Sequence, residues 1–366
     1  MKVALVSPYG EKLSGGIINW TKHIINYHKN NDNNVELSLI YNKKSKAYKG
    51  NGHILHQLLA GVSNYLPICL DFRKLVKRER IEVVHICSSA KFGLIRDLIL
   101  TKIAHKHGTK VVVHFHFGRT QQLLLSDGWE HRLFVRLLKR VDRVVVMEMN
   151  GYNTLLQKKY SHVSYLPNPL GINVQNYISK KAHLTRENRK IVFAGHIVKA
   201  KGVYELVEAC RDINDIKLIL MGHATNEKII KDLHSLAGEG GEHWLRFTGN
   251  VSLEKVIDEM MTCSVFVLPT YIEGFPNVII ESMACGCPII TTPVGAIPEM
   301  LAIHSEEPCG ICIEPKNTDQ LRDAINLLLN DTNLASLYGE RSKKRVNEEY
   351  SMKIVWERLM KIWENL

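Results

Sequence analysis

The sequence predicts an α/β protein built from two parallel β-sheets with helices on both faces. Short apolar runs rich in valine and isoleucine alternate with longer segments of helical period throughout the 366 residues. A chain of this length exceeds what one hydrophobic core usually holds, and 45% of its residues are hydrophobic. A polar stretch from about 168 to 189 interrupts both patterns. We therefore expect two domains of similar construction, joined at this stretch.

Twelve strands are expected, six on each side of the polar stretch. The first six are predicted at 3–6, 35–40, 83–86, 111–115, 143–147 and 163–166. The second six are predicted at 191–194, 216–220, 245–248, 265–268, 288–291 and 311–313. Helical periods fill the gaps. In the last helix, near 352–365, Trp356 and Trp363 stand seven residues apart, and we interpret them as packing anchors.

The composition argues against a secreted or membrane-spanning protein. The opening apolar run is too short for a secretory signal and suits a first buried strand. No apolar run reaches the roughly 18 residues that a membrane span needs. The eight cysteines are expected to be reduced core thiols. The pairs Cys285/Cys287 and Cys309/Cys312 leave a four-thiolate zinc site open, although each pair falls where we expect a helix end, turn or strand.

The most informative segment sets two carboxylates, Glu273 and Glu281, around a helix start. Gly274 permits a tight turn after the strand at 265–268, and Pro276 suits the first helical position. A helix that begins near 276 would direct its free N–H groups and its dipole toward an anion such as a diphosphate. Glu281 would lie about 7.5 Å along that helix, roughly the step from a diphosphate to its ribose hydroxyls.

This segment resembles the carboxylate motif of family 4 glycosyltransferases, which use nucleotide sugars and have the GT-B fold. The resemblance implies that Glu273 contacts the donor sugar near the reacting carbon and that Glu281 binds the nucleotide ribose. It also implies donor contacts from four intervening residues, Gly274, Phe275, Asn277 and Val278. Pro276 stands where the family often has glycine, which leaves the anion site with one N–H donor fewer.

A second motif places Gly195 after a strand and Lys201 at the start of the following helix. It resembles the family loop in which an arginine and a lysine neutralise the donor diphosphate. The resemblance assigns Lys201 to the leaving diphosphate, which gains negative charge in the transition state. His196 stands where the arginine is usual, and histidine is only partly charged near neutral pH. Lys199 is the candidate that compensates.

Two glycine-containing loops extend the expected donor site. Gly15 and Gly16 precede a helix near 17, where adjacent glycines let the backbone approach a ligand and helix-start amides attract phosphate. The family has a similar pair near the donor phosphates and the acceptor; a plain flexible turn stays open as the alternative. By resemblance, Gly249 and Asn250 hold the nucleotide base through backbone groups. Gly295 resembles another family loop and is interpreted as architectural.

Two histidines, His114 and His116, stand at the end of the strand at 111–115. Positions i and i+2 share a face of a strand, and ligands bind at strand ends in such sheets. His116 is the better match to a family histidine close to the donor sugar. For His114 we favour the alternative, a polar residue whose hydrogen bonds are satisfied at a strand end.

Positive charge is concentrated in the first half of the chain. Residues 1–180 hold 27 basic and 11 acidic residues, a net +16, whereas the remainder carries −5 of the total +11. Basic residues gather in the run 73–80 and on a probable amphipathic helix with Arg132, Arg136, Lys139, Arg140 and Arg143. Such a patch attracts anionic lipid head groups or a lipid diphosphate carrier. The alternative is a solvated basic surface; no nucleic-acid partner is expected.

The resemblance covers nearly the whole chain and implies an organisation and an activity. An acceptor domain at 1–175 would precede a nucleotide-sugar domain at 185–350, and a helix at 351–366 would cross back to the first domain. The implied reaction is a retaining, metal-independent hexosyl or N-acetylhexosaminyl transfer in cell-envelope polysaccharide synthesis, with Glu273, Lys201 and His116 as catalytic residues.

The expected donor of this reaction is a nucleotide sugar, UDP-linked rather than GDP-linked, and the expected acceptor is a glycan or a lipid-linked glycan. No cofactor or metal is expected. The protein is expected in the cytoplasm, with a peripheral position on the inner face of the plasma membrane left open. Two alternatives remain, a GT-B nucleotide-sugar 2-epimerase and a catalytically silent partner subunit.

Overall fold

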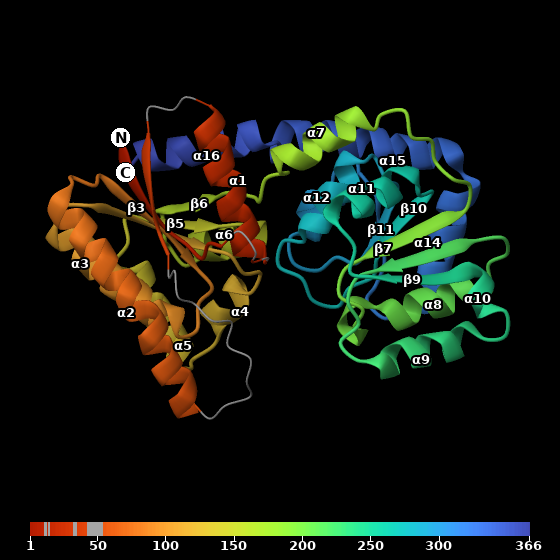
Figure 1. Cartoon of the computed structure of the whole chain (residues 1–366), viewed down its shortest axis with the longest axis horizontal. Coiled ribbons are helices and arrows are strands. Elements are labelled where there is room, and N and C mark those ends of the chain that lie inside the picture. The colour runs from red at the N-terminus through yellow and green to blue at the C-terminus, as the bar shows by residue number, and fades with distance from the viewer. Residues whose placement is uncertain (11–12, 14, 32–34, 42–53) are drawn as a thin grey trace. The chain divides into compact units, whose positions relative to one another are not determined.

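The computed structural model describes residues 1–10, 13, 15–31, 35–41 and 54–366, with the side chains of 54–63 excluded (Figure 1). The chain forms two compact units. The first comprises Met1–Asn168 and Val355–Leu366, and the second comprises Pro169–Ile354. Each unit contains one parallel six-stranded sheet, so the expected α/β class is confirmed.

The sheet of the first unit has the strand order β2-β1-β3-β4-β5-β6. Its strands are β1 (Lys2–Val6), β2 (Glu36–Ile40), β3 (Val83–Ser88), β4 (Lys110–Phe115), β5 (Arg143–Val146) and β6 (Val163–Tyr165). The accompanying helices are α1 (Gly16–Asn30), α2 (Ile54–Arg78), α3 (Gly93–Lys106), α4 (Thr120–Leu125), α5 (Trp129–Leu138), α6 (Met149–Gln157) and α16 (Met352–Glu364). Strand order reverses beside β1, which marks the carboxyl ends of β1, β3 and β4 as a ligand edge.

The sheet of the second unit has the strand order β12-β11-β10-β7-β8-β9. Its strands are β7 (Lys190–Ala194), β8 (Lys217–Met221), β9 (Leu245–Gly249), β10 (Val265–Leu268), β11 (Ile289–Thr291) and β12 (Ile311–Cys312). The corresponding switch point lies between β7 and β10, and both loops that leave it carry expected site residues.

The helices of the second unit begin with α7 (Ile172–Lys180) and end with a π-helical turn, η2 (Val346–Tyr350). Between these two lie η1 (Lys199–Lys201, 3-10), α8 (Val203–Arg211), α9 (Glu227–Ala237), α10 (Gly241–Trp244), α11 (Leu253–Thr262), α12 (Asn277–Ala284), α13 (Ile297–Met300), α14 (Thr318–Asn330) and α15 (Thr332–Arg345). All twelve expected strands are confirmed, with ends within two residues of the expected ones. The central strands are apolar on both faces because helices cover both.

The polar stretch at 168–189 is not the structureless connection that the sequence suggested. It contains α7, which packs on α11 and α12 and belongs to the second unit, so the first unit ends at Asn168 and not at 175. The helical period was hard to see because α7 buries only one residue fully, Val174. The hydroxyl of Tyr177 fixes the helix by donating a 3.0 Å hydrogen bond to Asp258.

The two tryptophans of α16 are buried packing residues, as expected. Trp356 lies 5.6 Å from the ring of Tyr27 in α1, between ring centroids. Trp363 donates a 3.1 Å hydrogen bond from Nε1 to Nδ1 of His85 on β3. The last twelve residues, from Val355 on, therefore belong to the first unit, although α16 begins in the second.

Among the helices that the structure describes, none has the length and apolar character to cross a membrane.

Candidate functional site

The loop that connects β10 to α12 carries the two-carboxylate motif. Helix α12 begins at Asn277, so Pro276 is the capping residue before the helix. We had expected Pro276 at the first helical position. Its φ of −75° and ψ of 110° are extended, and its carbonyl accepts a 3.0 Å hydrogen bond from the backbone N–H of Ile279. The missing proline N–H therefore lies just outside the helix start. The amides at that start belong to Asn277 and Val278, both half-buried.

The ammonium of Lys201 contacts the carboxylate of Glu273, although 72 residues separate them in the sequence. The side chains are 21% and 17% exposed, so the pair is accessible to a ligand but partly withdrawn from water. Two bonds to the carbonyl of Ala200 hold the loops together: the N–H of Tyr271 donates at 2.9 Å and the hydroxyl of Thr270 at 3.2 Å. The structure thus brings together two of the three expected catalytic residues.

Two glycines make this contact between loops sterically possible. Gly202 has φ 69°, and a Cβ there would lie 2.0 Å from the carbonyl oxygen of Pro269. Gly295 has φ 59°, and its Cβ would lie 2.4 Å from the carbonyl oxygen of Glu273. The neighbouring Ala296 N–H donates a 2.8 Å hydrogen bond to the carbonyl of Gly274. The architectural role expected for Gly295 therefore consists of supporting the peptide of Glu273.

Glu281 lies one helical turn beyond the start of α12 and is half-buried. Within the described residues its carboxylate makes no hydrogen bond or ion pair. Burial raises the pKa of this carboxyl from 4.5 to about 7. A desolvated carboxylate without a protein donor is an acceptor available to hydroxyl groups of a ligand.

The loops after β7, β8 and β9 meet at a glycine that the sequence analysis missed. Gly222 has φ 136°, and a Cβ there would lie 1.9 Å from the carbonyl oxygen of Gly195. Its N–H donates a 3.0 Å hydrogen bond to the carbonyl of Gly249. A glycine two residues after the predicted strand at 216–220 was the available signal. His196 and Lys199 are exposed near this junction, and neither side chain makes a hydrogen bond or ion pair within the described residues.

The remaining donor-site residues differ in what they can offer a ligand. Gly249 has φ 65°, and no atom lies within 4 Å of where its Cβ would be. Asn250 is exposed. The ring of Phe275 is 8% exposed and pairs with Tyr350 at 6.1 Å between centroids. Phe275 therefore offers a donor its backbone and not its side chain.

In the first unit, the glycine pair lies at the start of α1. Gly15 caps the helix with φ 144°, a conformation that side chains rarely adopt, and Gly16 is the first helical residue. A Cβ at Gly16 would have no neighbour within 4 Å, and at Gly15 only the side chain of Ile18 at 3.9 Å. Among the described residues this helix start is therefore open.

His116 lies just past the carboxyl end of β4, within a cluster of histidines and tryptophans. Its ring centroid is 3.9 Å from that of His114 and 5.0 Å from that of Trp20. Burial and the neighbouring His85 lower the pKa of His116 to about 3, so its imidazole is neutral at physiological pH. Among the described residues, neither ring nitrogen of His116 has a hydrogen-bond partner.

His114 does not have the satisfied hydrogen bonds that we had favoured for it. It is fully buried, and both of its ring nitrogens lack a hydrogen-bond partner in the part of the chain that the structure describes. Burial, with His116 and His85 as neighbours, lowers its pKa well below the ordinary value. A further residue that the sequence analysis missed is Glu148, two residues after β5, which is 3% exposed and accepts a 3.2 Å hydrogen bond from the N–H of Thr120. Its position two residues beyond a strand was the signal.

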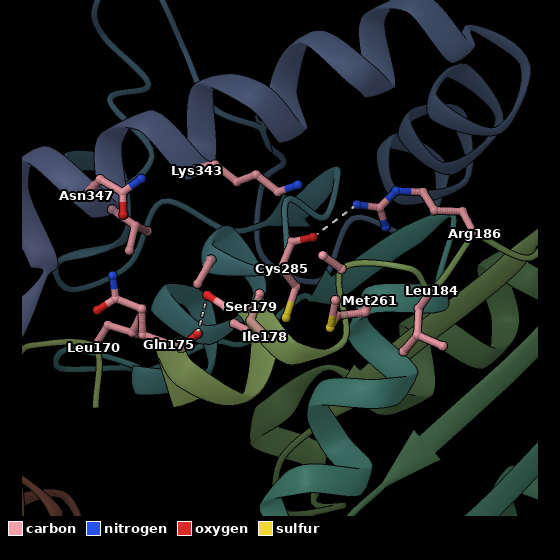
Figure 2. A pocket seen from close by; sticks show the side chains of 13 residues that line it. Leu170, Gln175, Ile178, Ser179, Leu184, Arg186, Met261, Cys285, Lys343 and Asn347 are labelled. Atoms are coloured by element: carbon pink, nitrogen blue, oxygen red, sulfur yellow. Dashed lines mark hydrogen bonds between the residues drawn. The ribbon is translucent and has the colours of Figure 1, made fainter. Parts of the chain in front are cut away.

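A cavity of about 470 Å³ lies elsewhere in the second unit, at the C-terminal end of α12 (Figure 2). Cys285, Met261 and Lys343 line it, and none of the expected site residues does. Arg186 closes one side by donating hydrogen bonds to the carbonyls of Cys263, Cys285 and Gly286. Across the described chain, no three His, Cys, Asp or Glu side chains are grouped so as to hold a metal ion, so the four-thiolate alternative has no support.

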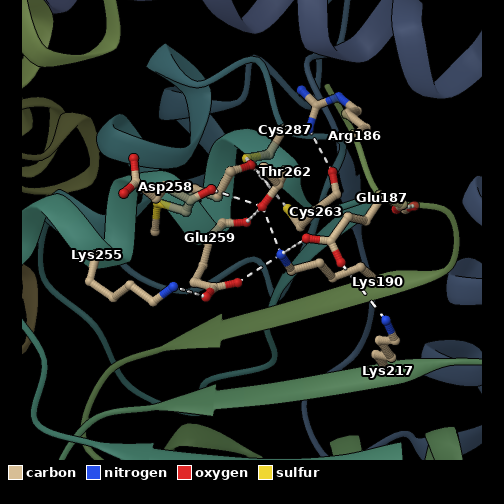
Figure 3. Close-up of polar contacts among 12 residues, drawn as sticks. Arg186, Glu187, Lys190, Lys217, Lys255, Asp258, Glu259, Thr262, Cys263 and Cys287 are labelled. Carbon is tan, nitrogen blue, oxygen red and sulfur yellow. Dashed lines mark hydrogen bonds and ion pairs between the residues drawn. The ribbon is translucent and has the colours of Figure 1, made fainter. Parts of the chain in front are cut away.

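A buried ion network nearby fastens the first strand of the second sheet to α11 (Figure 3). The ammonium of Lys190 lies 2.6 Å from Glu187, 2.7 Å from Glu259 and 2.7 Å from the hydroxyl of Thr262. Burial alone would lower the pKa of Lys190, but the two carboxylates raise it. The ammonium of Lys190 contacts three side chains of its own unit, so we assign this network to structure.

Comparisons show that the chain is similar to known glycosyltransferases. Residues 175–345, most of the second unit, match the family model of glycosyl transferases group 1. The chain is 29% identical over 253 residues to the capsular polysaccharide biosynthesis glycosyltransferase CapM of Staphylococcus aureus, covering 66% of this chain and 61% of CapM. It is 25% identical to MJ1178, an uncharacterized glycosyltransferase of Methanocaldococcus jannaschii, covering 94% of this chain and 90% of that protein. The chain thus matches about three fifths of the length of CapM.

Among solved structures, the chain is similar to HepE of Anabaena in complex with UDP. The TM-score is 0.74 at 16% identity, and the match covers 100% of both chains. This likeness confirms the GT-B fold that the sequence predicted. The family model, the relatives and the fold together support a glycosyltransferase of the GT-B type.

Proposed function

We propose that the protein is a retaining glycosyltransferase that takes a sugar from a nucleotide-sugar donor bound by its second unit. The observation that carries this proposal is the contact between Lys201 and Glu273. Gly202 and Gly295 hold the two residues at the carboxyl edge of the sheet, and the unpartnered carboxylate of Glu281 follows on α12. The ammonium of Lys201 and the start of α12 suit the diphosphate of such a donor, and the carboxylate of Glu281 suits its ribose.

In the proposed reaction, Lys201 exchanges part of its contact with Glu273 for the donor diphosphate. The bond from the sugar anomeric carbon to the diphosphate oxygen breaks, and a bond to the acceptor oxygen forms on the same face. The departing diphosphate takes the acceptor proton. Lys201 and the start of α12 stabilise the charge that develops on it, while Glu273 orients the sugar. His196 and Lys199, both exposed, are the candidates for a second cationic contact.

The first unit is proposed to bind the acceptor. A neutral His116 offers a sugar hydroxyl either a donor or an acceptor, because its ring nitrogens have no protein partner. The open helix start at Gly15 and Gly16 suits a phosphate or the acceptor backbone. A UDP-linked hexose or N-acetylhexosamine is proposed as donor; the UDP bound by the solved neighbour HepE supports the uracil nucleotide.

A lipid-linked glycan of cell-envelope polysaccharide synthesis is proposed as acceptor, in line with the name of the CapM relative. The surface formed by α2, α3 and α5 supports a peripheral position on an anionic membrane, at the cytoplasmic face. Its exposed apolar side chains are Leu66, Leu70, Ile95 and Ile99. Arg132, Arg136, Lys139 and Arg140 are exposed on α5 and just after it. An apolar centre with basic neighbours is typical of interfacial binding.

The decisive experiment measures UDP binding and sugar transfer for the parent and three variants. We expect Lys201→Ala to lose at least about 100-fold in transfer, because it removes charge stabilisation of the leaving diphosphate. Glu273→Ala should lower turnover more than donor affinity, and Glu281→Ala should mainly weaken nucleotide binding. EDTA should leave the parent unaffected.

Two results would refute this assignment. If EDTA abolished transfer while Lys201→Ala kept it, a metal-dependent mechanism would replace the one proposed. If the three variants matched the parent, the site would lie elsewhere. Donor turnover in the absence of any acceptor would instead indicate a nucleotide-sugar epimerase.

A further inference from the structure

The first unit exposes a stacked aromatic pair at the ligand edge of its sheet. The rings of Phe92 and Trp129 lie 5.0 Å apart between centroids, with 23° between their planes. Phe92 precedes α3, which follows β3, and Trp129 is the first residue of α5, which leads to the amino end of β5. Both residues therefore lie at the carboxyl edge of the sheet, the edge of His116. One face of the Trp129 ring packs on Phe92, and Trp129 is 51% exposed, which leaves its other face accessible among the described residues.

A polar brace fixes the positions of both rings. The carboxylate of Glu130, next to Trp129, accepts a 2.8 Å hydrogen bond from the N–H of Lys91, next to Phe92. The same carboxylate accepts two hydrogen bonds from the guanidinium of Arg119, at 3.1 Å and 2.5 Å. These contacts, the hydrogen bonds of Arg119 foremost, lower the pKa of Glu130, so it stays ionised. Arg119 itself follows His116 by three residues, which places the brace near the proposed acceptor site.

The turn beneath the brace is conformationally unusual. Ala90 and Lys91 are consecutive non-glycine residues with φ of 62° and 52°. Side chains rarely adopt this left-handed conformation, so both residues are strained. The Glu130 contact to the N–H of Lys91 holds the turn in place. An arrangement of this kind keeps the plane of the aromatic pair fixed before any ligand arrives.

We propose that the Phe92–Trp129 pair is a stacking platform for a pyranose ring of the acceptor. The open face of Trp129 would cover the apolar C–H face of the sugar, and the groups of the Arg119–Glu130 brace at its edge would bond the hydroxyls. The inference rests on the proposed transferase function, because it assigns the acceptor a sugar at this position. Since Arg119 and Glu130 neutralise one another, the platform suits an uncharged sugar.

An exposed tryptophan can also insert into a lipid bilayer, but the structure favours a sugar as the partner of Trp129. Membrane insertion requires only apolar area, which Ile95 and Ile99 supply farther along α3. Stacking on a sugar needs a ring of fixed orientation beside hydrogen-bonding groups. Trp129 has both: its ring is fixed by Phe92, and Glu130 and Arg119 lie beside it.

The test uses saturation-transfer NMR on the full chain with methyl glycosides of glucose, galactose and N-acetylglucosamine. At least one glycoside should receive saturation from the parent protein. Trp129→Ala should weaken its binding by roughly fivefold or more, and Trp129→Phe should retain much of it, because an aromatic face remains. Leu125→Ala is the matched control, since Leu125 is 69% exposed in the same region and outside the pair.

UDP binding and vesicle binding are measured on the same proteins. These measurements distinguish a failure of the platform proposal from a failure of the transferase assignment. If UDP binds and no glycoside signal depends on Trp129, the platform is refuted while the transferase assignment stands. If Trp129→Ala loses binding to vesicles that contain phosphatidylglycerol but keeps its glycoside signal, Trp129 is a membrane anchor and the platform is also refuted. If UDP does not bind, the transferase assignment fails, and the glycoside signals still decide whether a sugar platform exists.

Discussion

Glu281 shows how much of the candidate donor site depends on single residues. A carboxylate in a largely desolvated position without a protein donor is costly to maintain unless a ligand uses it. The raised pKa of Glu281 places its titration near neutral pH. Glu273 contacts the cation of Lys201, whereas Glu281 contacts no cation among the described residues. The two carboxylates of one motif therefore have different electrostatic surroundings, which matches the different roles proposed for them.

The protonation of Glu281 predicts a pH-dependent affinity for the nucleoside. We expect uridine to bind about fivefold or more weakly at pH 6 than at pH 8, because a protonated carboxyl accepts fewer hydrogen bonds from ribose. Uridine is the suitable ligand, since it has no phosphate that titrates in this range. Glu281→Gln should bind weakly at both pH values. A calorimetric titration that finds the same uridine affinity for the parent at both values would contradict the role assigned to Glu281.

The same pKa has the opposite consequence for stability. Since the folded-state value of about 7 lies above the ordinary 4.5, this group stabilises the fold fully below pH 4.5, and the contribution is lost as the pH rises through 7. Glu281→Gln cannot ionise, so it should raise the denaturation midpoint relative to the parent at pH 8 and change it little at pH 5. Thermal denaturation followed by circular dichroism at the two pH values measures this difference.

At the scale of elements, the donor site consists of loops locked to one another rather than of any one helix or strand. The loop after β10 is bound to the carbonyl of Ala200 on one side and to Ala296 on the other. Glycines provide the space at both contacts, because a Cβ would overlap a backbone carbonyl there. A substitution in one of these loops should therefore displace Glu273 even where the substituted residue does not contact Glu273.

Gly202 and Gly249 allow this idea to be tested with a matched pair. Both have positive φ, 69° and 65°, but a Cβ at Gly202 would meet Pro269 at 2.0 Å, whereas at Gly249 it would meet nothing within 4 Å. Gly249→Ala should cost about 1 kcal/mol of unfolding free energy from backbone strain alone. Gly202→Ala should cost at least about 2 kcal/mol more, because backbone must also move. Equal losses in urea denaturation would show that the Gly202 contact does not constrain the loops.

The sequence predicted the elements better than the contacts between them. All twelve strands were recognisable because buried parallel strands are continuous apolar runs, and the motif residues follow directly after them. Helix α7 was missed because it is only nine residues long, lies in a polar stretch and buries only Val174 fully. The brace between Lys91, Arg119 and Glu130 was missed for another reason. It joins residues as far as 39 positions apart, and no local pattern records such a contact.

At the scale of the whole molecule, the two units differ in charge and in proposed role. The first half of the chain carries +16 and the second half −5, although the proposed diphosphate donor binds in the second unit. In the proposed mechanism, donor binding therefore depends on a few placed groups, Lys201 and the start of α12, rather than on net charge. The excess of positive charge in the first unit therefore requires another explanation. Together with the exposed apolar side chains on the helices of this unit, it supports the proposed binding to an anionic membrane.

This charge asymmetry predicts salt-dependent membrane binding by the first unit. The protein should bind vesicles of phosphatidylcholine that contain phosphatidylglycerol, and added salt should weaken binding because charge attraction is screened beyond about 10 Å at 0.1 M. Replacing Arg132, Arg136 and Arg140 by glutamate should reduce vesicle binding severalfold in a sedimentation assay. UDP affinity should stay unchanged, since these residues lie on and directly after α5, in the unit that does not carry the proposed donor site.

A charge-matched control separates a specific patch from net charge. Lys228, Lys231 and Lys353 are exposed and lie in the second unit, so their replacement by glutamate changes the total charge equally. If the α5 patch docks on the membrane, the control should lose much less binding than the α5 variant. Equal losses would mean that the protein responds to its net charge alone. Absence of vesicle binding at low salt, or full activity of the α5 variant on a lipid-linked acceptor, would indicate a soluble acceptor and a solvated basic surface.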